Sequence, residues 1–138
     1  MSDKVFVDTN ILVYARDASE PEKQVRAEAL VRDLWQGRTG RISTQVLNEY
    51  FVTVTRKLSP GLSDEQAWRD IEDLASWSPL PVNMELLQRG HSFHERFSLS
   101  WWDSLILAAA EMSGCGKVYS EDLSHDQTYF GVQGVTPF

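Results

Sequence analysis

The chain alternates between short apolar runs and longer segments in which apolar residues recur with helical spacing. The run VFV leaves no polar face, so we predict a short, fully buried strand over residues 4–8. Further strands are predicted over residues 117–120 and 134–136, and residues 80–82 are a possible strand. The segment 41–43 is too short to assign by itself.

The segments between these strands place apolar residues at i, i+3, i+4 and i+7, which is the spacing of an amphipathic helix. The predicted helices run from the capping-box residues at Ser19 to Gly37, from Thr44 to the break at Pro60-Gly61, and over residues 63–76, 84–97 and 101–113. The last segment is apolar nearly all round, which indicates a buried helix. Short strands separated by helices predict an α/β fold with a central parallel sheet and helices on both faces.

Composition and charge disfavour several classes of protein, among them membrane proteins, secreted proteins and general nucleic-acid coats. With 138 residues, the chain is expected to form a single domain, residues 1–138. Its one cysteine, Cys115, excludes an internal disulfide and favours a reducing cytoplasm. No apolar run approaches the roughly 20 residues of a membrane span, and the start MSDKVFVD is not a secretory signal. The net charge of −7 argues against a general nucleic-acid coat, so a nucleic-acid enzyme here would need a cation.

Four acidic residues fall near the ends of predicted elements. Asp8 ends the first strand, and Asp122 follows the strand over residues 117–120. Asp103 lies in the first turn of the apolar helix, and Glu49 lies early in the helix that begins at Thr44. Parallel sheets bind ligands at the carboxyl ends of their strands, and carboxylate oxygens suit Mg²⁺ or Mn²⁺. Together these residues predict a metal site, because clustered carboxylates repel one another without a cation.

Each acid also has a purely structural interpretation. Asp8 could cap the helix that follows it, and Asp103 could close a capping box with Ser100. Asp122 could belong to an Asx-turn. The helical position of Glu49 lies well away from the apolar stripe, which is typical of a solvated surface residue. No single residue therefore establishes the site.

The ordered motifs VFVDTNILVYA, RISTQVLNEY, LSWWDSLILAAA and VYSEDL resemble the successive motifs of the PIN-domain family. The resemblance runs from residue 5 to the terminal segment 135–138, although residues 60–98 match the family in helical character rather than in motif. Within the family, the chain is most similar to the VapC-type toxins of bacterial toxin–antitoxin pairs. The resemblance therefore implies a PIN-like three-layer fold.

The resemblance also implies a function and a set of site residues. The catalytic and metal-binding residues it implies are Asp8, Glu49, Asp103 and Asp122, supported by Thr9, Asn10 and Ser120. The implied activity is an Mg²⁺- or Mn²⁺-dependent endoribonuclease that leaves 3′-hydroxyl and 5′-phosphate ends. Asp126 is an additional acid outside the core pattern.

The implied partners are an RNA substrate, a small antitoxin that covers the acidic site with a basic side chain, and a second copy of the chain in a homodimer. An alternative is a metal-binding PIN-like interaction module without nuclease activity. Two other enzyme-like classes fit poorly. A haloacid dehalogenase needs an aspartate where Asn10 stands, and a receiver domain needs a lysine after the late strand, whereas Lys117 precedes it.

Residues that could contact RNA are less clearly marked. Trp101 and Trp102 could stack on bases, but at the start of a buried helix we interpret them as core residues. The candidate phosphate contacts are two basic pairs, Arg38 with Arg41 and Arg56 with Lys57. We interpret the second pair as a solvated helix end. His91 and His94 lie in one predicted helix without an acid partner of matching motif, and we interpret them as surface or packing residues. His125 follows the acidic loop and could contact the substrate.

Overall fold

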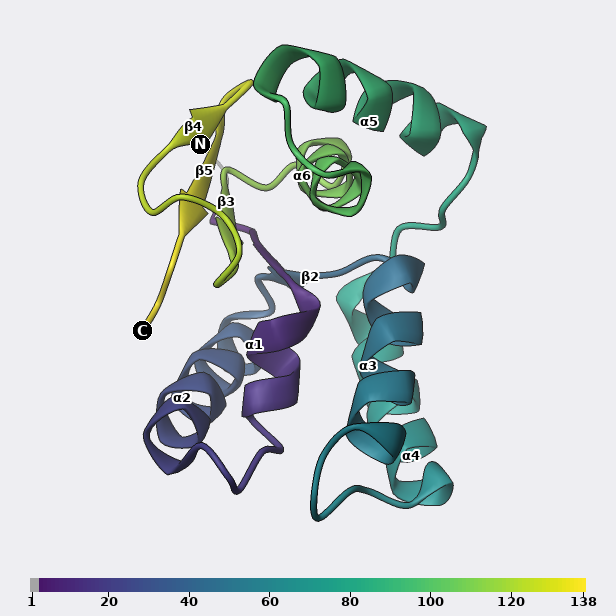
Figure 1. The fold of residues 1–138 in the computed structure, drawn as a ribbon, viewed down its shortest axis with the longest axis vertical. Coiled ribbons are helices and arrows are strands. Elements are labelled where there is room, and N and C mark those ends of the chain that lie inside the picture. The colour runs from purple at the N-terminus through teal and green to yellow at the C-terminus, as the bar shows by residue number, and fades with distance from the viewer. Residues whose placement is uncertain (1–2) are drawn as a thin grey trace.

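The computed structural model describes residues 3–138, and these contain one five-stranded sheet (Figure 1). The strands are β1 (Val5–Val7), β2 (Gly40–Arg41), β3 (Lys117–Tyr119), β4 (Thr128–Tyr129) and β5 (Val132–Val135). Their order is β2-β1-β3-β5-β4. All neighbouring strands are parallel except β4, which is antiparallel to β5. The predicted central parallel sheet is thus confirmed, with an antiparallel edge strand that the sequence did not indicate.

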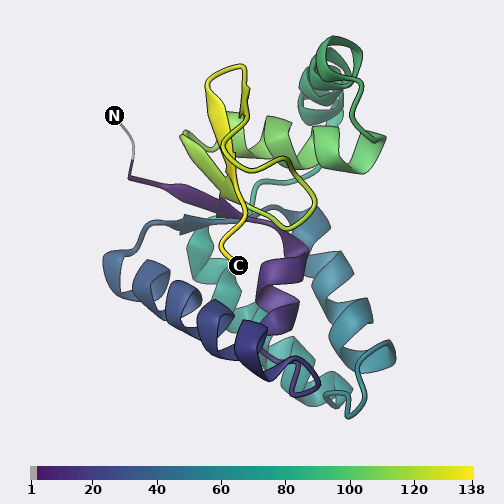
Figure 2. The same cartoon turned by 60° about the vertical axis from the view of Figure 1, so that its left-hand side comes forward.

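Helices cover both faces of this sheet. They are α1 (Thr9–Tyr14), α2 (Pro21–Gly37), α3 (Thr44–Arg56), α4 (Asp64–Leu74), α5 (Met84–Phe97) and α6 (Trp101–Met112), with a short 3-10 helix η1 (Ala75–Trp77) after α4. Figure 2 shows α5 and α6 on one side of the sheet and α1 and α2 on the other. This arrangement confirms the predicted α/β architecture. None of the helices in residues 3–138 is long and apolar enough to cross a membrane.

Two sequence predictions need correction. The possible strand over residues 80–82 does not form, and Leu80 makes only an isolated parallel bridge with Ser43. Pro81 has no backbone N–H to donate, so pairing cannot continue along this segment. The predicted helix over residues 63–76 ends at Leu74, and the chain tightens there into η1.

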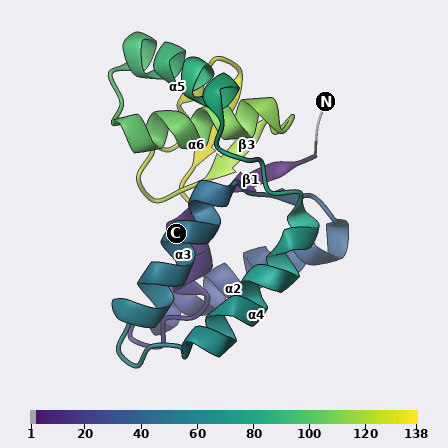
Figure 3. The same cartoon turned by 90° about the vertical axis from the view of Figure 1, so that its right-hand side faces the viewer.

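The buried helix α6 fixes one wall of the site. Its residues from Ser104 to Ala110 are buried, as the sequence predicts, and α6 contacts β1, β3 and β5. Helix α5 lies alongside it (Figure 3). A Cβ at Gly90 would lie 2.6 Å from Leu105 Cδ2, so the absence of a side chain lets these two helices approach closely. The start of α6 is thereby held near the carboxyl ends of β1 and β3.

The other wall comes from α1 and α3. Helix α1 packs against α2 and α3, and α3 packs against α4. Apolar residues of both helices join the same core cluster as the strands, among them Ile11, Val46 and Val54. Cys115 belongs to this cluster too, and burial raises the pKa of its thiol to about 11. This supports its interpretation as a structural residue.

Candidate metal site

Asp8 lies where β1 ends and α1 begins. Its residue is only 6% exposed, and its Oδ1 accepts a hydrogen bond of 2.7 Å from the Thr9 backbone N–H, so it is the N-cap of α1. Its Oδ2 accepts a second hydrogen bond of 2.7 Å from the Ser120 hydroxyl. The capping interpretation is therefore confirmed, but it does not compete with the site. The cap and the strand end together hold this carboxylate in one orientation.

Asp103 is the third residue of α6. Ser100 caps the helix by accepting the Asp103 backbone N–H at 3.1 Å. The reciprocal bond from the Ser100 N–H to the Asp103 carboxylate, which would complete a capping box, is absent between these two described residues. The Asp103 side chain lines the same cavity as Asp8 instead. Burial raises the pKa of Asp103, a side-chain hydrogen bond with Ser100 lowers it in part, and the nearby charge of Asp122 adds to the increase.

Asp122 lies in the loop that follows β3. Its backbone N–H donates to the Ser120 hydroxyl at 3.1 Å, and its carboxylate accepts from Asn10 Nδ2 at 3.1 Å. The carboxylate makes no Asx-turn bond to a described backbone N–H, so that interpretation is wrong. Ser120, which is fully buried, bonds both Asp8 and the backbone of Asp122 and thereby sets their separation.

These three aspartates converge. One carboxylate oxygen from each of Asp8, Asp103 and Asp122 lies within 4.8 Å of the others. They line a cavity of about 460 Å³, here called the acid cavity. Three hard oxygen donors around one point are a donor set that suits a divalent cation such as Mg²⁺ or Mn²⁺. The residues present therefore fit a metal ion.

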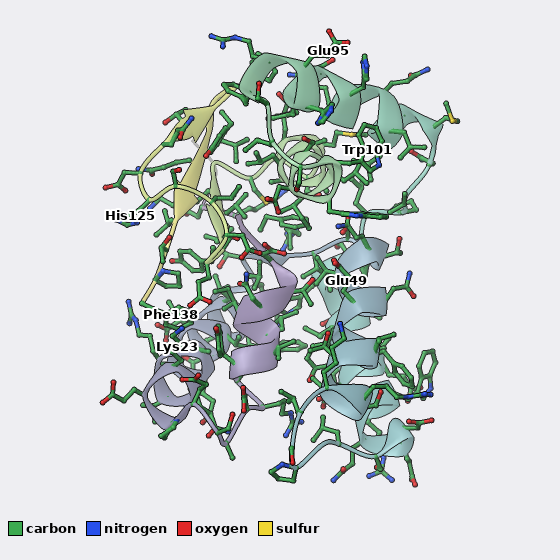
Figure 4. All side chains as sticks on the ribbon, in the orientation of Figure 1. Lys23, Glu49, Glu95, Trp101, His125 and Phe138 are labelled. Carbon is green, nitrogen blue, oxygen red and sulfur yellow. The ribbon has the colours of Figure 1, made fainter. Side chains whose placement is uncertain are left out.

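Glu49 borders the acid cavity but lies outside the group of three. It is exposed, as its position off the apolar stripe predicts, and Figure 4 shows it on α3, across from the sheet. Its Oε1 accepts from the Thr9 hydroxyl at 3.1 Å and from Gln45 Nε2 at 3.3 Å. The structure thus brings all four sequence-predicted acids to one cavity, with Glu49 at its rim.

Without a bound cation, burial and mutual repulsion disfavour the charged forms of the carboxylates in the acid cavity. Burial raises the pKa of Asp8 to about 7, while the bonds from Ser120 and Thr9 lower it. The charges of Asp122 and Asp103 add to the increase. Among residues 3–138, no lysine or arginine forms an ion pair with any of the three aspartates. A cation from outside would remove this penalty.

Sequence reasoning missed the residues that hold the Asp122 loop. Glu121 accepts from the Tyr14 hydroxyl and from Lys23 Nζ, each at 2.6 Å, and its backbone N–H donates to Asn10 Oδ1 at 3.4 Å. Figure 4 shows Lys23 beside Phe138, at the start of α2. Lys23 and Glu121 are 98 positions apart, so no local pattern links them. Gln45 was findable, since it stands four residues before Glu49 on one helix face.

The other candidates lie elsewhere. Trp102 is 62% exposed and borders the acid cavity, so its interpretation as a core residue is wrong, whereas Trp101 packs against the core. Among the described residues that line the acid cavity there is no histidine, and neither basic pair contributes. Asp126 is exposed outside it, where it accepts from Gln133 and pairs with His125.

Comparison with known proteins places this geometry in context. The family model of the PIN domain matches residues 5–131. A chain from a toxin–antitoxin complex of Klebsiella pneumoniae has a TM-score of 0.69 and 18% identity, with 98% of each chain covered. The VapC20 toxin of Mycobacterium tuberculosis, described as cleaving the sarcin–ricin loop, has a TM-score of 0.65 and 20% identity, covering 86% of this chain and 90% of its own. No curated protein sequence matches the chain.

Proposed function

Because the chain belongs to the PIN-domain family, we propose that it is an Mg²⁺- or Mn²⁺-dependent endoribonuclease and the toxin of a toxin–antitoxin pair. The observation that carries the proposal is the convergence of Asp8, Asp103 and Asp122 within 4.8 Å, with no cation of the described chain to balance them. The fold likeness to a chain from a toxin–antitoxin complex supports the same proposal.

Each residue has a proposed role. Asp8, Asp103 and Asp122 would hold the metal, and Glu49 at the rim would contribute a fourth carboxylate through a bound water. When bound, the cation supplies a water of lowered pKa and offsets charge that develops on the phosphate. Ser120, Asn10 and Thr9 orient the carboxylates through the hydrogen bonds described above. Hydrogen bonds of this kind, which are made to the metal ligands and not to the metal, affect metal affinity and activity because they orient the ligands.

The test is RNA cleavage with Mg²⁺ or Mn²⁺, comparing the wild type with Asp8→Asn and Asp103→Asn. Asparagine caps a helix about as well as aspartate does, so both variants should fold. Each nevertheless removes a ligand charge, so the turnover number should fall by about a hundredfold or more. The products should carry 5′-phosphate and 3′-hydroxyl ends.

Asp126→Asn is the matched control for this experiment. Asp126 has a positive φ of 63°, which asparagine also tolerates, and it lies outside the acid cavity. Melting temperatures measured alongside would show that the variants are folded. Folded Asp8→Asn and Asp103→Asn proteins that cut RNA at the wild-type rate would overturn the proposal. A wild type that binds Mn²⁺ but cuts no RNA would favour the interaction module.

The proposed biological partners follow from the same chemistry. A small antitoxin that inserts an arginine or lysine into the acid cavity would supply the missing positive charge. A homodimer would cover part of the exposed apolar surface, which includes Val52 and Met84. We place this activity in the cytoplasm, where the RNA and the antitoxin would be found.

Two measurements test these partners. A short open reading frame beside the gene, encoding a DNA-binding fold, should express a protein that copurifies with this chain and blocks cleavage. Sedimentation of the purified chain should give twice its monomer mass. A monomer at all concentrations would exclude the homodimer without affecting the nuclease proposal.

A further inference from the structure

A second cavity adjoins the acid cavity between α3 and α6. It encloses about 610 Å³ and is here called the side cavity. The two cavities share Gln45, Glu49 and Trp102 in their walls. The two cavities are therefore adjacent, so an extended ligand bound at the three aspartates would lie beside the side cavity.

The exposed side chain of Trp102 is the main indication that the side cavity binds a ligand. Trp102 is the residue directly before Asp103, it borders both cavities, and it is 62% exposed although the middle of its helix is buried. Burying an exposed indole lowers the free energy, and the flat face of the indole is suited to stacking on another ring. In the sequence, Trp102 is adjacent to Asp103, a proposed metal ligand.

The other lining groups indicate what kind of ring would fit. Val82 and Leu105 supply apolar walls, and Asn48 carries a side-chain amide that makes no hydrogen bond to the described residues. No lysine or arginine lines the side cavity, and Glu49 adds a negative charge at its edge. A phosphate would find no positive partner here. An uncharged aromatic group with hydrogen-bonding edges would find both a stacking surface and a free amide.

We propose that the side cavity binds one unstacked base of the RNA substrate, adjacent to the phosphate held at the acid cavity. Trp102 stacks on the base, and the Asn48 amide contacts its edge. Stacking on an aromatic side chain requires a base free of its duplex, so the substrate is single-stranded at this position. The proposal rests on the proposed nuclease function and adds a specificity-determining pocket to it.

A protein surface is the competing occupant, since Val82 and Met84 are also exposed nearby. Two observations favour the base. The side cavity adjoins the acid cavity rather than an isolated apolar face, and its indole face and the Asn48 amide suit a planar, polar-edged ligand better than an aliphatic side chain. The experiment separates the two.

Binding is measured by fluorescence anisotropy with Mg²⁺ present, in an Asp8→Asn background so that the RNA stays intact. The probe is a short, labelled oligoribonucleotide selected for binding from a random pool. Adding Trp102→Ala should weaken binding by about five- to a hundredfold, whereas Trp102→Phe, which keeps an aromatic face, should restore most of the affinity. Trp68→Ala is the matched control, because Trp68 is 55% exposed on α4 and lines neither cavity.

An abasic scan of the same oligoribonucleotide makes the test specific. Removing the base at one position should weaken binding to the parent protein, but the same abasic RNA should bind Trp102→Ala no worse than the intact RNA does. Asn48→Ala should show a smaller loss at that same position.

Three results of the RNA-binding measurements would overturn the pocket assignment. They are unchanged affinity in Trp102→Ala, an abasic effect that persists in that variant, and the absence of RNA binding by the parent. Loss of a dimer in Trp102→Ala with RNA binding intact would assign the cavity to a protein partner and overturn the proposal too. RNA binding that depends on Trp102, in a protein whose wild type cuts no RNA, would support the pocket while rejecting the nuclease function.

Discussion

Two carboxylates of this protein are held in opposite ways. Asp70, on α4, accepts two hydrogen bonds from Arg16, at 3.0 and 2.6 Å, and one of 2.6 Å from the Tyr50 hydroxyl on α3. Each oxygen of Asp8 also accepts a hydrogen bond, but the donors, Thr9 and Ser120, are neutral. The first carboxylate is balanced in charge within the chain. The second is balanced only in hydrogen bonding, and two further aspartates face it.

This difference separates a structural ion pair from a binding site. Burying a carboxylate without a positive partner disfavours its charged form, and neighbouring carboxylates increase the penalty. If these acids served folding alone, an ion pair like that of Asp70 with Arg16 would balance their charge within the chain. The acid cavity instead leaves its charge to be balanced from outside, which is how a metal site behaves before its ion arrives.

A cation built into the acid cavity would give its carboxylates the kind of partner that Asp70 has. Asn10→Lys places an ammonium group where the amide now contacts Asp122 at 3.1 Å. The metal-free protein should then melt at a higher temperature, because the carboxylates gain a partner as Asp70 has. RNA cleavage should fall by about a thousandfold, since the ammonium competes with the metal ion for the same carboxylates.

Gln36→Lys is the control for that change. Gln36 is exposed on α2, far from the acid cavity, and the substitution adds the same charge. It should leave cleavage and its metal dependence as in the wild type. An Asn10→Lys protein that is folded and fully active would show that the cavity does not act through a bound cation.

The next prediction concerns pH. The pKa of Asp8 is raised from 3.8 to about 7, so the folded protein binds a proton that the unfolded chain releases, and this contribution to stability is lost as the pH rises from about 4 to about 7. Asp8→Asn removes the titrating group. Without metal, the variant should therefore be more stable than the wild type at pH 8, by up to about 4 kcal/mol, and the gap should close towards pH 4.

Asp70→Asn should have the opposite sign. It removes a carboxylate that is already paired, so we expect it to lower the free energy of unfolding at pH 8 by about 1–2 kcal/mol. Chemical denaturation in a metal chelator at several pH values measures both changes. If both variants were destabilised equally at pH 8, the two carboxylates would not differ in the way the geometry indicates.

A third prediction uses the metal itself. Mg²⁺ or Mn²⁺ at a hundredfold excess over its dissociation constant should stabilise the wild type by about 2.7 kcal/mol, because the unfolded chain lacks the assembled site. Asp8→Asn should respond much less, and Asp70→Asn should respond fully. Thermal melting across a metal titration measures this. Equal responses of the two variants would place the ion outside the acid cavity.

The sequence was sufficient for those parts of the site that depend on local pattern. The apolar run before Asp8 predicted a buried strand that ends on an acid, and the all-round apolar segment after Asp103 predicted the buried helix α6. In both cases the neighbouring residues alone decide burial. The predicted gathering of acids then followed from the rule that parallel strands point their carboxyl ends to one edge.

Other features depend on contacts that no local pattern records. Trp102 lies in the first turn of an apolar helix, which predicts a core residue, but its side chain borders the two cavities, whereas Trp101 beside it packs against the core. Strand β4 has only two residues and pairs because a tight turn brings it beside β5. The partners of Glu121 come from α1 and α2, over a hundred residues away in the case of Tyr14.

The smallest predicted effect tests that last network. Glu121 lies between Ser120 and Asp122, and Lys23 and Tyr14 hold both of its carboxylate oxygens. Glu121 is therefore a cation-paired acid, like Asp70, placed directly beside the unpaired one. Glu121→Gln keeps an acceptor for Tyr14 but removes the charge that binds Lys23. The loop should loosen, and the apparent affinity for Mn²⁺ should fall by up to about tenfold, the lower end of the range for residues that orient metal ligands.

Cleavage at saturating Mn²⁺ should remain near the wild-type rate, because the ligands themselves are intact. Lys23→Met should reproduce the effect, and Glu121→Gln combined with Lys23→Met should add little, since both remove the same contact. Metal titrations of cleavage measure all three proteins. Losses that simply multiply in the double variant, or a lowered rate at saturating metal, would mean that Glu121 acts on the acid cavity by some route other than its bond to Lys23.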